Sequence, residues 1–363
     1  MKRSSGSSLS FESRPLPRVF VLEVTRRCNN RCSYCYTAWN APDLGYDVNK
    51  NEEMTTDEIK DVVAKLQHEA PVESIALSGG EPLIRADLPE IVKAISAGGS
   101  DAVIITNGTL LSEERVATTV ADSTYEITLL SHRPETHDRL TRHPGSWNAV
   151  VDGMANVHKA QGSFVAAFIA TKLNAGDLQK TVELAIALGA EGLMYNRMNL
   201  GAYNMRYADD LLPTPGMIAE NLDSLDEIAG KYGFPIAASV VIEPCVVDTR
   251  KYKNIHFGSC PLAGPDSYFT IDPIGNVRVC NHSPVVLGSI RERSFSSIYF
   301  GGDSGRYLRS FHDTLPVECV GCDPDLLALC RGGCKAASEQ CYGTIEKVDP
   351  FVRLNRFHTT GEV

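Results

Sequence analysis

The sequence has no long apolar run, and nowhere does it reach the about 20 consecutive apolar residues that a membrane-spanning helix needs. Positive charge is also scarce, because 35 Lys and Arg residues face 45 Asp and Glu residues and the formal net charge is −10. Nucleic acids and anionic membrane surfaces favour basic partners. We therefore expect no nucleic-acid partner and no membrane association.

The N-terminal region lacks the apolar segment of a secretory signal peptide, since residues 1–18 are rich in Ser, Arg and Pro. We expect a flexible lead-in there and a cytoplasmic protein. The 11 cysteines then need an explanation other than disulfide bonds, which are rare in the cytosol and which an odd number fits poorly. This cysteine content indicates metal or redox chemistry.

Between residues 19 and 242, short apolar runs alternate with amphipathic ones. We predict a helix that starts at the capping box of Thr55, helices with Asp87 and Ser146 as N-caps, and a helix that ends before Gly189. Alternating strands and helices predict an α/β fold, a curved partial (β/α)6 barrel with its reactive groups at the carboxyl ends of the strands. The predicted strands are 19–24, 74–77, 102–106, 126–130, 164–171 and 193–198.

Beyond residue 243 the composition changes to Cys-, Gly- and Pro-rich sequence with short elements. Residues 268–271 and 276–279 flank a turn and predict a hairpin. We therefore divide the chain into a lead-in (1–18), a barrel (19–242), a small Cys-rich domain (243–345) and a tail (346–363).

Three cysteines, Cys28, Cys32 and Cys35, lie just after the first predicted strand, with Tyr34 before the last of them. Three thiolates on one loop can hold three irons of a [4Fe–4S] cluster and leave the fourth iron open to another ligand. A zinc loop or buried free thiols are the alternative, although this triplet is one ligand short of a structural zinc site. The CxxxCxxC spacing resembles the signature loop of the radical S-adenosylmethionine (AdoMet) enzymes, in which the open iron chelates AdoMet.

Later strand ends carry further residues that resemble motifs of this family. Gly79, Gly80, Glu81 and Pro82 match its GGEP motif, in which glycines allow close backbone approach and oxygens can accept hydrogen bonds from the AdoMet amine. The resemblance also implies AdoMet contacts near the ends of the next strands, from Asn107, Ser131, Arg142, Asn174 and Arg197. For Arg142 a solvated charge is an equal alternative, since its segment is one residue longer than the family pattern.

The resemblance implies an activity as well as a fold. In this family a reduced [4Fe–4S] cluster cleaves AdoMet to a 5′-deoxyadenosyl radical, and the radical abstracts a hydrogen atom from the substrate. An electron donor of the flavodoxin or ferredoxin type is therefore an expected partner. The cofactor supplies the difficult chemistry, and the protein supplies binding and orientation.

The remaining cysteines resemble the SPASM extension of this family in order and spacing, except that the gap between Cys322 and Cys330 is two residues longer than usual. Such a domain carries two auxiliary [4Fe–4S] clusters. By the family order, the ligands of the outer cluster would be Cys319, Cys322, Cys330 and Cys341. Those of the inner cluster would be Cys260, Cys280 and Cys334.

Two alternatives remain for these cysteines. Cys245 either completes the inner cluster or is a small buried side chain, which would leave one iron open to substrate. A zinc ribbon could instead form from the pairs Cys319/Cys322 and Cys330/Cys334, but it would leave Cys260, Cys280 and Cys341 unexplained.

The resemblance narrows the substrate class only in part. SPASM proteins mostly modify ribosomally made peptides or proteins, and a minority act on small molecules such as sugars or tetrapyrroles. Asn281 stands where sulfatase maturases carry an aspartate base, so we do not expect formylglycine formation. We select Asn281 and His282 as catalytic candidates, for proton transfer or for tuning the neighbouring cluster.

The short lead-in also bears on partners. Fewer than 20 residues precede the first predicted strand, which is too few for a fused leader-peptide recognition domain. We therefore expect a separate leader-recognition protein, or recognition by the barrel itself. A non-catalytic zinc-binding protein is the remaining alternative of a different class.

Overall fold

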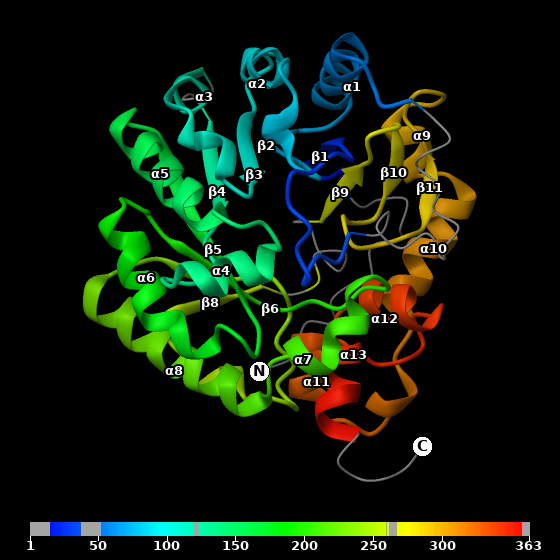
Figure 1. The fold of residues 1–363 in the computed structure, drawn as a ribbon. Coiled ribbons are helices and arrows are strands. Elements are labelled where there is room, and N and C mark those ends of the chain that lie inside the picture. The colour runs from blue at the N-terminus through cyan, green and yellow to red at the C-terminus, as the bar shows by residue number, and fades with distance from the viewer. Residues whose placement is uncertain (1–14, 38–51, 120–122, 259, 261–266, 358–363) are drawn as a thin grey trace, which may run out of the picture.

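The computed structural model describes residues 15–37, 52–119, 123–258, 260 and 267–357, so most of the lead-in and the last six residues of the tail lie outside the described residues. Its framework is a single curved sheet with helices on the outer side (Figure 1). The described residues form eleven strands in the order β11-β10-β9-β1-β2-β3-β4-β5-β6-β7-β8. The first strand of the chain therefore lies inside the sheet, between β2 and β9.

Neighbouring strands from β1 to β8 pair in parallel, as the alternation of elements predicts. The six predicted strands are confirmed to within two residues at each end, whereas β7 and β8 were not predicted because three residues carry no recognisable period. The strands are β1 Val19–Thr25, β2 Ser74–Gly79, β3 Asp101–Thr106, β4 Thr124–Thr128, β5 Ser163–Ala170, β6 Leu193–Arg197, β7 Ile236–Ala238 and β8 Ile255–Phe257.

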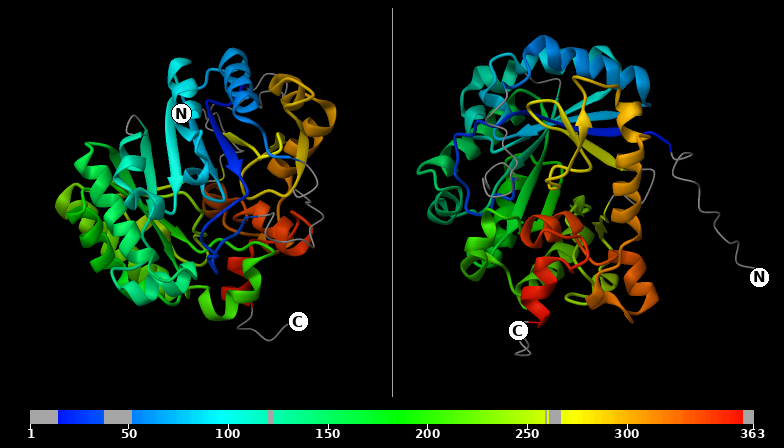
Figure 2. Two further views of the ribbon diagram at one scale, coloured as in Figure 1. Left: turned by 45° about the horizontal axis from the view of Figure 1, so that its top comes forward. Right: turned by 90° about the vertical axis from the view of Figure 1, so that its right-hand side faces the viewer.

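The helices of the barrel follow these strands and cover the outer face of the sheet (Figures 1 and 2). They bury one apolar side, which in the first of them holds Ile59, Val62 and Leu66. The helices are α1 Thr56–Glu69, α2 Leu88–Ala97, α3 Glu114–Thr119, α4 Pro134–Thr141, α5 Ser146–Lys159, α6 Leu178–Ala187, α7 Ala208–Leu211 and α8 Pro215–Tyr232. None of the helices in the described residues combines the length and apolar character that crossing a membrane requires.

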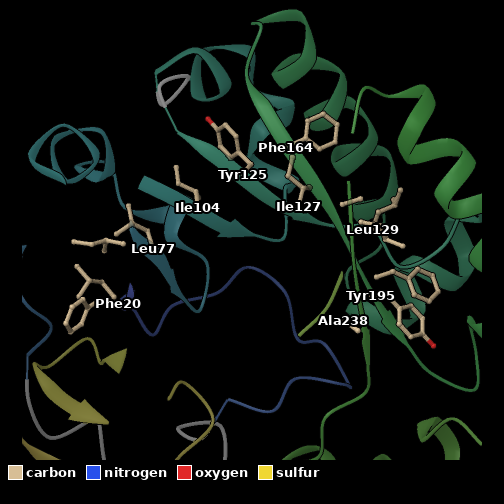
Figure 3. Close-up of a cluster of buried hydrophobic side chains, with 14 of the residues drawn as sticks. Phe20, Leu77, Ile104, Tyr125, Ile127, Leu129, Phe164, Tyr195 and Ala238 are labelled. Carbon is tan, nitrogen blue, oxygen red and sulfur yellow. The ribbon is translucent and has the colours of Figure 1, made fainter. Parts of the chain in front are cut away.

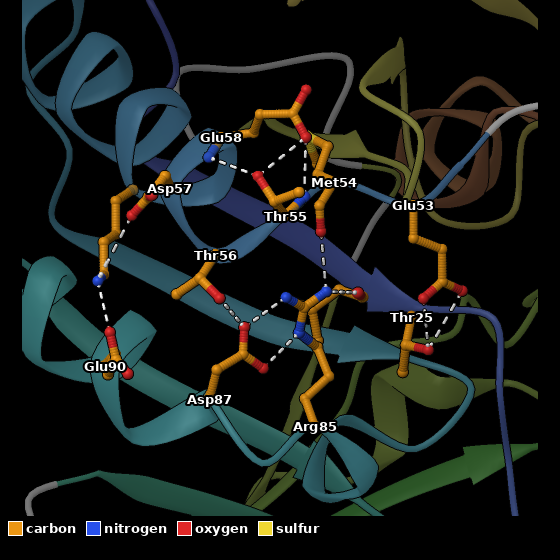
Figure 4. Close-up of polar contacts among 12 residues, drawn as sticks. Thr25, Glu53, Met54, Thr55, Thr56, Asp57, Glu58, Arg85, Asp87 and Glu90 are labelled. Carbon is orange, nitrogen blue, oxygen red and sulfur yellow. Dashed lines mark hydrogen bonds and ion pairs between the residues drawn. The ribbon is translucent and has the colours of Figure 1, made fainter.

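The predicted helix signals meet different outcomes. The capping box of Thr55 is confirmed, since Thr55 and Glu58 bond each other's backbone N–H groups, and Gly189 follows the α6 C-cap with φ of +95°. Asp87 precedes α2, but its carboxylate accepts hydrogen bonds from Arg85 and Thr56 instead of capping the helix (Figure 4). The prediction for Ser146 was wrong by one residue, because Gly145 is the N-cap of α5.

The core between sheet and helices is continuous across the strands (Figure 3). One row of register partners, from β1 to β5, is almost completely buried: Leu22, Leu77, Ile104, Tyr125 and Phe164. Burying a large apolar side chain is worth roughly 1.5–3 kcal/mol. Because successive side chains of a strand point to opposite faces of the sheet, the residues before and after each member of this row face the inside of the barrel.

The C-terminal part extends the sheet on the other side of β1. The predicted hairpin is confirmed as β9 and β10, and β9 pairs with β1 in parallel. The predicted boundary at residues 242–243 stays a prediction, and the sheet continues across it. The elements are β9 Tyr268–Ile271, β10 Asn276–Arg278, β11 Val286–Ser289, α9 Phe295–Tyr299, α10 Gly302–Asp313, α11 Pro324–Cys330, α12 Lys335–Tyr342, α13 Pro350–Val352 and a π-helix Arg353–Phe357.

A buried ion pair joins the two parts of the sheet. Arg278 of β10 binds Glu23 of β1, and both side chains are less than 5% exposed. Removing one partner leaves the other charge buried without compensation, which typically costs about 3–5 kcal/mol.

We therefore expect Glu23→Ala to lower the melting temperature of the reconstituted protein by several degrees. The control is Asp303→Ala, which removes the exposed pair with Arg306 and should leave the melting temperature unchanged. Equal melting temperatures for both variants would show that the buried pair contributes nothing to stability.

Candidate metal and cofactor sites

The loop of Cys28, Cys32 and Cys35 begins three residues after β1 ends, at the carboxyl end of the strand. The three thiols lie close enough to affect one another electrostatically. Burial, together with the charges of Cys35 and Cys28, raises the pKa of Cys32 to about 12, and burial raises that of Cys28 to about 11. Thiols of this kind are protonated at neutral pH, so metal binding must displace their protons.

The loop is anchored to the end of α4. The backbone N–H groups of Arg31 and Ser33 donate to the carbonyl oxygens of Thr141 and Leu140, at 3.1 and 3.0 Å. The hydroxyl group of Tyr34 bonds the sulfur of Cys32, which adds to burial in raising the pKa of this tyrosine. The thiols are therefore presented by a loop held at both the strand and the helix.

The two glycines of the GGEP segment make room for this loop. A Cβ atom would lie 2.4 Å from the carbonyl oxygen of Thr25 at Gly79, and 2.2 Å from that of Arg27 at Gly80. Gly79 also has φ of +124°, which side chains rarely adopt. The backbone N–H of Gly80 donates to Thr25, so the end of β2 packs directly against the start of the cysteine loop.

Glu81 is 1% exposed, and its carboxylate is occupied by protein donors. It accepts hydrogen bonds from the Thr106 hydroxyl at 2.7 Å, from the Asn107 N–H at 2.8 Å and from the Leu83 N–H at 3.1 Å. Burial raises its pKa to about 7. In this structure Glu81 positions the ends of β2 and β3, with Pro82 beginning the short turn behind it.

Asn107 reaches the cysteine loop directly. Its side-chain amide donates to the side chain of Asn29 at 2.9 Å and lies 4.0 Å from the sulfur of Cys28. Its side-chain oxygen accepts from Thr109. Asn107 is therefore placed to orient the first cysteine of the triplet.

Ser131 and Asn174 are fully buried and have protein partners. The Ser131 hydroxyl donates to Asp177 at 2.6 Å. The Asn174 amide donates to the carbonyl oxygens of Leu130 and Ile169, at 2.8 and 2.9 Å, which lie at the ends of β4 and β5. These two side chains satisfy polar groups near the ends of the strands, and their proposed contacts with AdoMet stay predictions.

The two arginines differ in their surroundings. Arg142 is exposed, ends α4 with φ of 54° and donates to the hydroxyl of Tyr207 at 3.2 Å. Arg197 is fully buried at the end of β6 and forms ion pairs with Glu243 at 3.0 Å and Asp349 at 2.7 Å. The guanidinium group of Arg142 is therefore exposed, whereas that of Arg197 is enclosed between two carboxylates.

Asn281 and His282 lie against the residue that follows the cysteine triplet. The Asn281 amide donates to the Tyr36 hydroxyl at 2.6 Å, and the His282 ring lies 4.5 Å from the Tyr36 ring. His282 donates from Nε2 to the Leu200 carbonyl oxygen, while its buried Nδ1 has no hydrogen-bond partner among the described residues. Burial lowers the pKa of His282 to about 4, so its ring is neutral at pH 7.

Tyr36 was missed by the sequence analysis, although it links the two cysteine-bearing loops. It follows Cys35, and its bonded partner Asn281 follows Cys280. The adjacency of an aromatic residue to a ligand cysteine is a weak signal, and only the fold shows which residue it meets.

The other cysteines form two further groups. Cys260, Cys280 and Cys334 make up the inner group, in which burial and the charge of Cys260 raise the pKa of Cys280 to about 12. Burial and the charge of Asp349 raise the pKa of Cys334 most, and the charge of Cys280 raises it further. The outer group lines a cavity of about 390 Å³ and consists of Cys245, Cys319, Cys322 and Cys330.

The structure therefore differs from the family order at two positions. Cys245 lines the same cavity as Cys319, Cys322 and Cys330, and Cys341 does not line it. The fold brings residue 245 close to residues 319–330, which are distant from it in the sequence. The order of the cysteines therefore could not predict that it lines this cavity.

The donor sets fit iron–sulfur clusters, which are bound by thiolates. A triplet leaves one iron open, as in the loop of Cys28, and the four outer thiols make a complete set. Within the described part of the chain, no three Cys, His, Asp or Glu side chains converge as ligands of a single metal ion.

Comparisons with known proteins agree with this arrangement. The Radical SAM superfamily matches residues 22–185, and an iron–sulfur cluster-binding domain named SPASM matches residues 260–323. The chain is 27% identical over 361 residues to an AdoMet-dependent heme synthase of Methanosarcina barkeri, covering 92% of this chain and 96% of that protein. It is 26% identical over 351 residues to the PqqA peptide cyclase of Rhizobium meliloti, covering 93% and 88%.

The fold is shared with a solved protein. SuiB of Streptococcus suis, bound to its precursor peptide SuiA, superposes with a TM-score of 0.68 at 14% identity, over 92% of this chain and 75% of that one. A second SuiB structure holds S-adenosylmethionine.

The close approach at Gly80 yields a test of the cysteine loop. In Gly80→Ala the new methyl group meets backbone rather than a movable side chain, so we expect the loop to shift and about four irons per chain to be lost. The measurement is iron content after anaerobic reconstitution. Gly176→Ala is the matched control, since nothing lies within 4 Å of its Cβ and its iron content should equal that of the wild type. Full iron content in Gly80→Ala would contradict the tight packing.

Proposed function

The chain belongs to the radical SAM superfamily and carries a SPASM iron–sulfur domain, and on that premise we propose that this enzyme modifies a ribosomally made peptide or protein. Its cofactors are [4Fe–4S] clusters and AdoMet, which when bound supply the radical that abstracts a hydrogen atom from the substrate. The observation that carries the proposal is full-length similarity to a peptide cyclase, on a fold that holds a precursor peptide in SuiB. Cross-linking, oxidation and epimerisation are the outcomes open to such chemistry.

The residues would divide this work as follows. Cys28, Cys32 and Cys35 would hold the cluster that binds AdoMet, beside the backbone of Gly79 and Gly80 and the guanidinium group of Arg142. Asn281 and His282 contact Tyr36, the residue after Cys35, and would orient its ring and hydroxyl group beside this loop.

One acidic residue inside the barrel is suited to contact the substrate. Glu126 lies between Tyr125 and Ile127, which are buried in the outer core, so its side chain faces the inside. Its register partners there are Ile105 and Val165, both apolar. Burial raises its pKa to about 7, and its carboxylate has no hydrogen-bond partner among the described residues.

Glu126 also lies near the cofactor loop. After burial, its charge is among the causes that raise the pKa of Tyr36, the residue that follows Cys35. A peptide N–H group or cationic side chain of the substrate would supply the missing partner for this carboxylate.

A small-molecule substrate is the second candidate, favoured by the equal similarity to the heme synthase. A separate leader-recognition protein and an electron donor of flavodoxin or ferredoxin type are partners that we propose with the first candidate. Exposed apolar side chains next to the outer thiols, Val317 at 70% and Val320 at 74%, offer such a donor a docking surface.

The central prediction concerns Cys32. Anaerobically reconstituted wild-type protein should form 5′-deoxyadenosine from AdoMet with dithionite, and Cys32→Ala should form none, because one of three cluster ligands is gone. Wild-type protein should also transfer deuterium from a labelled precursor peptide to the 5′-deoxyadenosine that it forms, which mass spectrometry would detect. Transfer from a tetrapyrrole and from no peptide would favour the second candidate. Nucleoside formation by Cys32→Ala would contradict the radical mechanism.

A further prediction concerns Glu126. The carboxylate is charged only above its raised pKa of about 7, so product formation should fall as the pH drops below that value. Glu126→Gln should lower product formation at least about tenfold while AdoMet cleavage without substrate continues. The control is Glu191→Gln on the exposed end of the same barrel, which should behave as wild type. An unchanged pH profile in Glu126→Gln would remove this residue from substrate binding.

A further inference from the structure

The cavity of the outer group has a composition that the order of cysteines does not predict. Cys319, Cys322 and Cys330 come from one segment around α11, and Cys245 enters from the segment that leaves the barrel after β7. All four line the same cavity of about 390 Å³. Cys341, the residue that the family order names as the fourth ligand, does not line it.

Electrostatic coupling among these thiols supports the same grouping. Burial and then the charges of Cys330, Cys245 and Cys322 raise the pKa of Cys319 to about 12. The pKa of Cys330 is raised to about 11 by burial, and among the neighbouring charges that add to it are those of Cys245 and Cys322. Cys245 thus lies within reach of every other thiol in the cavity.

Cys341 has different neighbours. It is the last residue but one of α12, seven residues beyond Cys334, which corresponds to about 10 Å along a helix axis. Burial and the charge of Asp349 raise its pKa to about 12. Cys341 is therefore about two helical turns from Cys334, and it does not line the outer cavity.

The position of Cys245 is fixed by an ion pair. Glu243 binds the buried Arg197 at 3.0 Å, and its carbonyl oxygen accepts from the N–H groups of Val246 and Val247 at 2.8 and 3.0 Å. This turn directs Cys245 toward the cavity, where the guanidinium group of Arg356 bonds its sulfur. Burial raises the pKa of Cys245, and the guanidinium group of Arg356 opposes that shift.

We propose that Cys245, and not Cys341, is the fourth thiolate of the outer [4Fe–4S] cluster, together with Cys319, Cys322 and Cys330. Four thiolates complete the ligand set of such a cluster. Cys341 is then an ordinary half-buried thiol, and the inner group keeps three cysteines. This assignment concerns the cofactor alone and holds whichever substrate the enzyme takes.

The test compares Cys245→Ala with Cys341→Ala, each reconstituted separately under the same oxygen-free conditions. We expect Cys245→Ala to lose about four irons and four sulfides per chain relative to the wild type, and Cys341→Ala to lose none. The spin count of the dithionite-reduced proteins by electron paramagnetic resonance should fall by one cluster in the first variant only. Retained formation of 5′-deoxyadenosine shows that each variant is folded and keeps the cluster at Cys28.

Thiol alkylation provides a readout that does not depend on the variants. Unbound iron is first removed from reconstituted wild-type protein, which is then treated with a first alkylating reagent and afterwards denatured in excess of a second one. An iron-bound Cys245 should be labelled only by the second reagent, because the denaturant releases the cluster. A pulse of a first reagent on the native protein should therefore label Cys341 more than Cys245. Iron loss in Cys341→Ala, whether or not Cys245→Ala also loses iron, would overturn the proposal, and so would full iron content in Cys245→Ala.

Discussion

The pairing of β1 with β9 holds the two halves of the chain in one frame. Val19 lies opposite Tyr268 and Leu22 opposite Ile271, although about 250 residues separate them in the sequence. Both strands bury one face in the same core, so a slip by one residue would turn that face outward. The contact of Tyr36 with Asn281 and the bond between Glu23 and Arg278 depend on this register.

Local patterns allowed much of the barrel to be predicted. The six longer strands have enough apolar residues to be recognised, and the capping box of Thr55 marks a helix start through neighbours three residues apart. The short strands β7, β8 and β11 form because neighbouring strands pair with them. They are too short for an alternating pattern of apolar residues to predict them. The partner of β1 on its second side, likewise, is a property of the whole fold.

The type of cofactor site could be predicted from the sequence, whereas the contacts of its individual residues could not. The spacing of Cys28, Cys32 and Cys35 predicts a cluster loop through its resemblance to the radical SAM signature, and the structure places all three on one loop after β1. The expected AdoMet contacts of Ser131, Asn174 and Arg197 stay predictions, and the structure shows these side chains bonded to protein groups near the strand ends. Buried strand ends need such partners, and sequence alone does not separate a residue that satisfies the backbone from one that binds a ligand.

Arg197 connects the barrel with the C-terminal segment. Its guanidinium group lies 4.3 Å from the centre of the Phe351 ring and binds Asp349, which also accepts from the N–H group of Cys334. Because Glu243 shares the same arginine, the inner thiols and the segment of Cys245 take their positions from one buried cation. A disturbance at the end of β6 would therefore reach both groups of cysteines.

The proposed ligand set of the outer cavity has a consequence for the stability of the C-terminal part. Between Cys245 and Cys319 lie more than 70 residues, which include β8, the β9–β11 strands and α10. A cluster that ties the two positions closes a long loop, and cross-links across long loops restrict the unfolded chain most. Such a cluster would therefore stabilise the C-terminal part against local unfolding more than any single contact on the surface of the barrel.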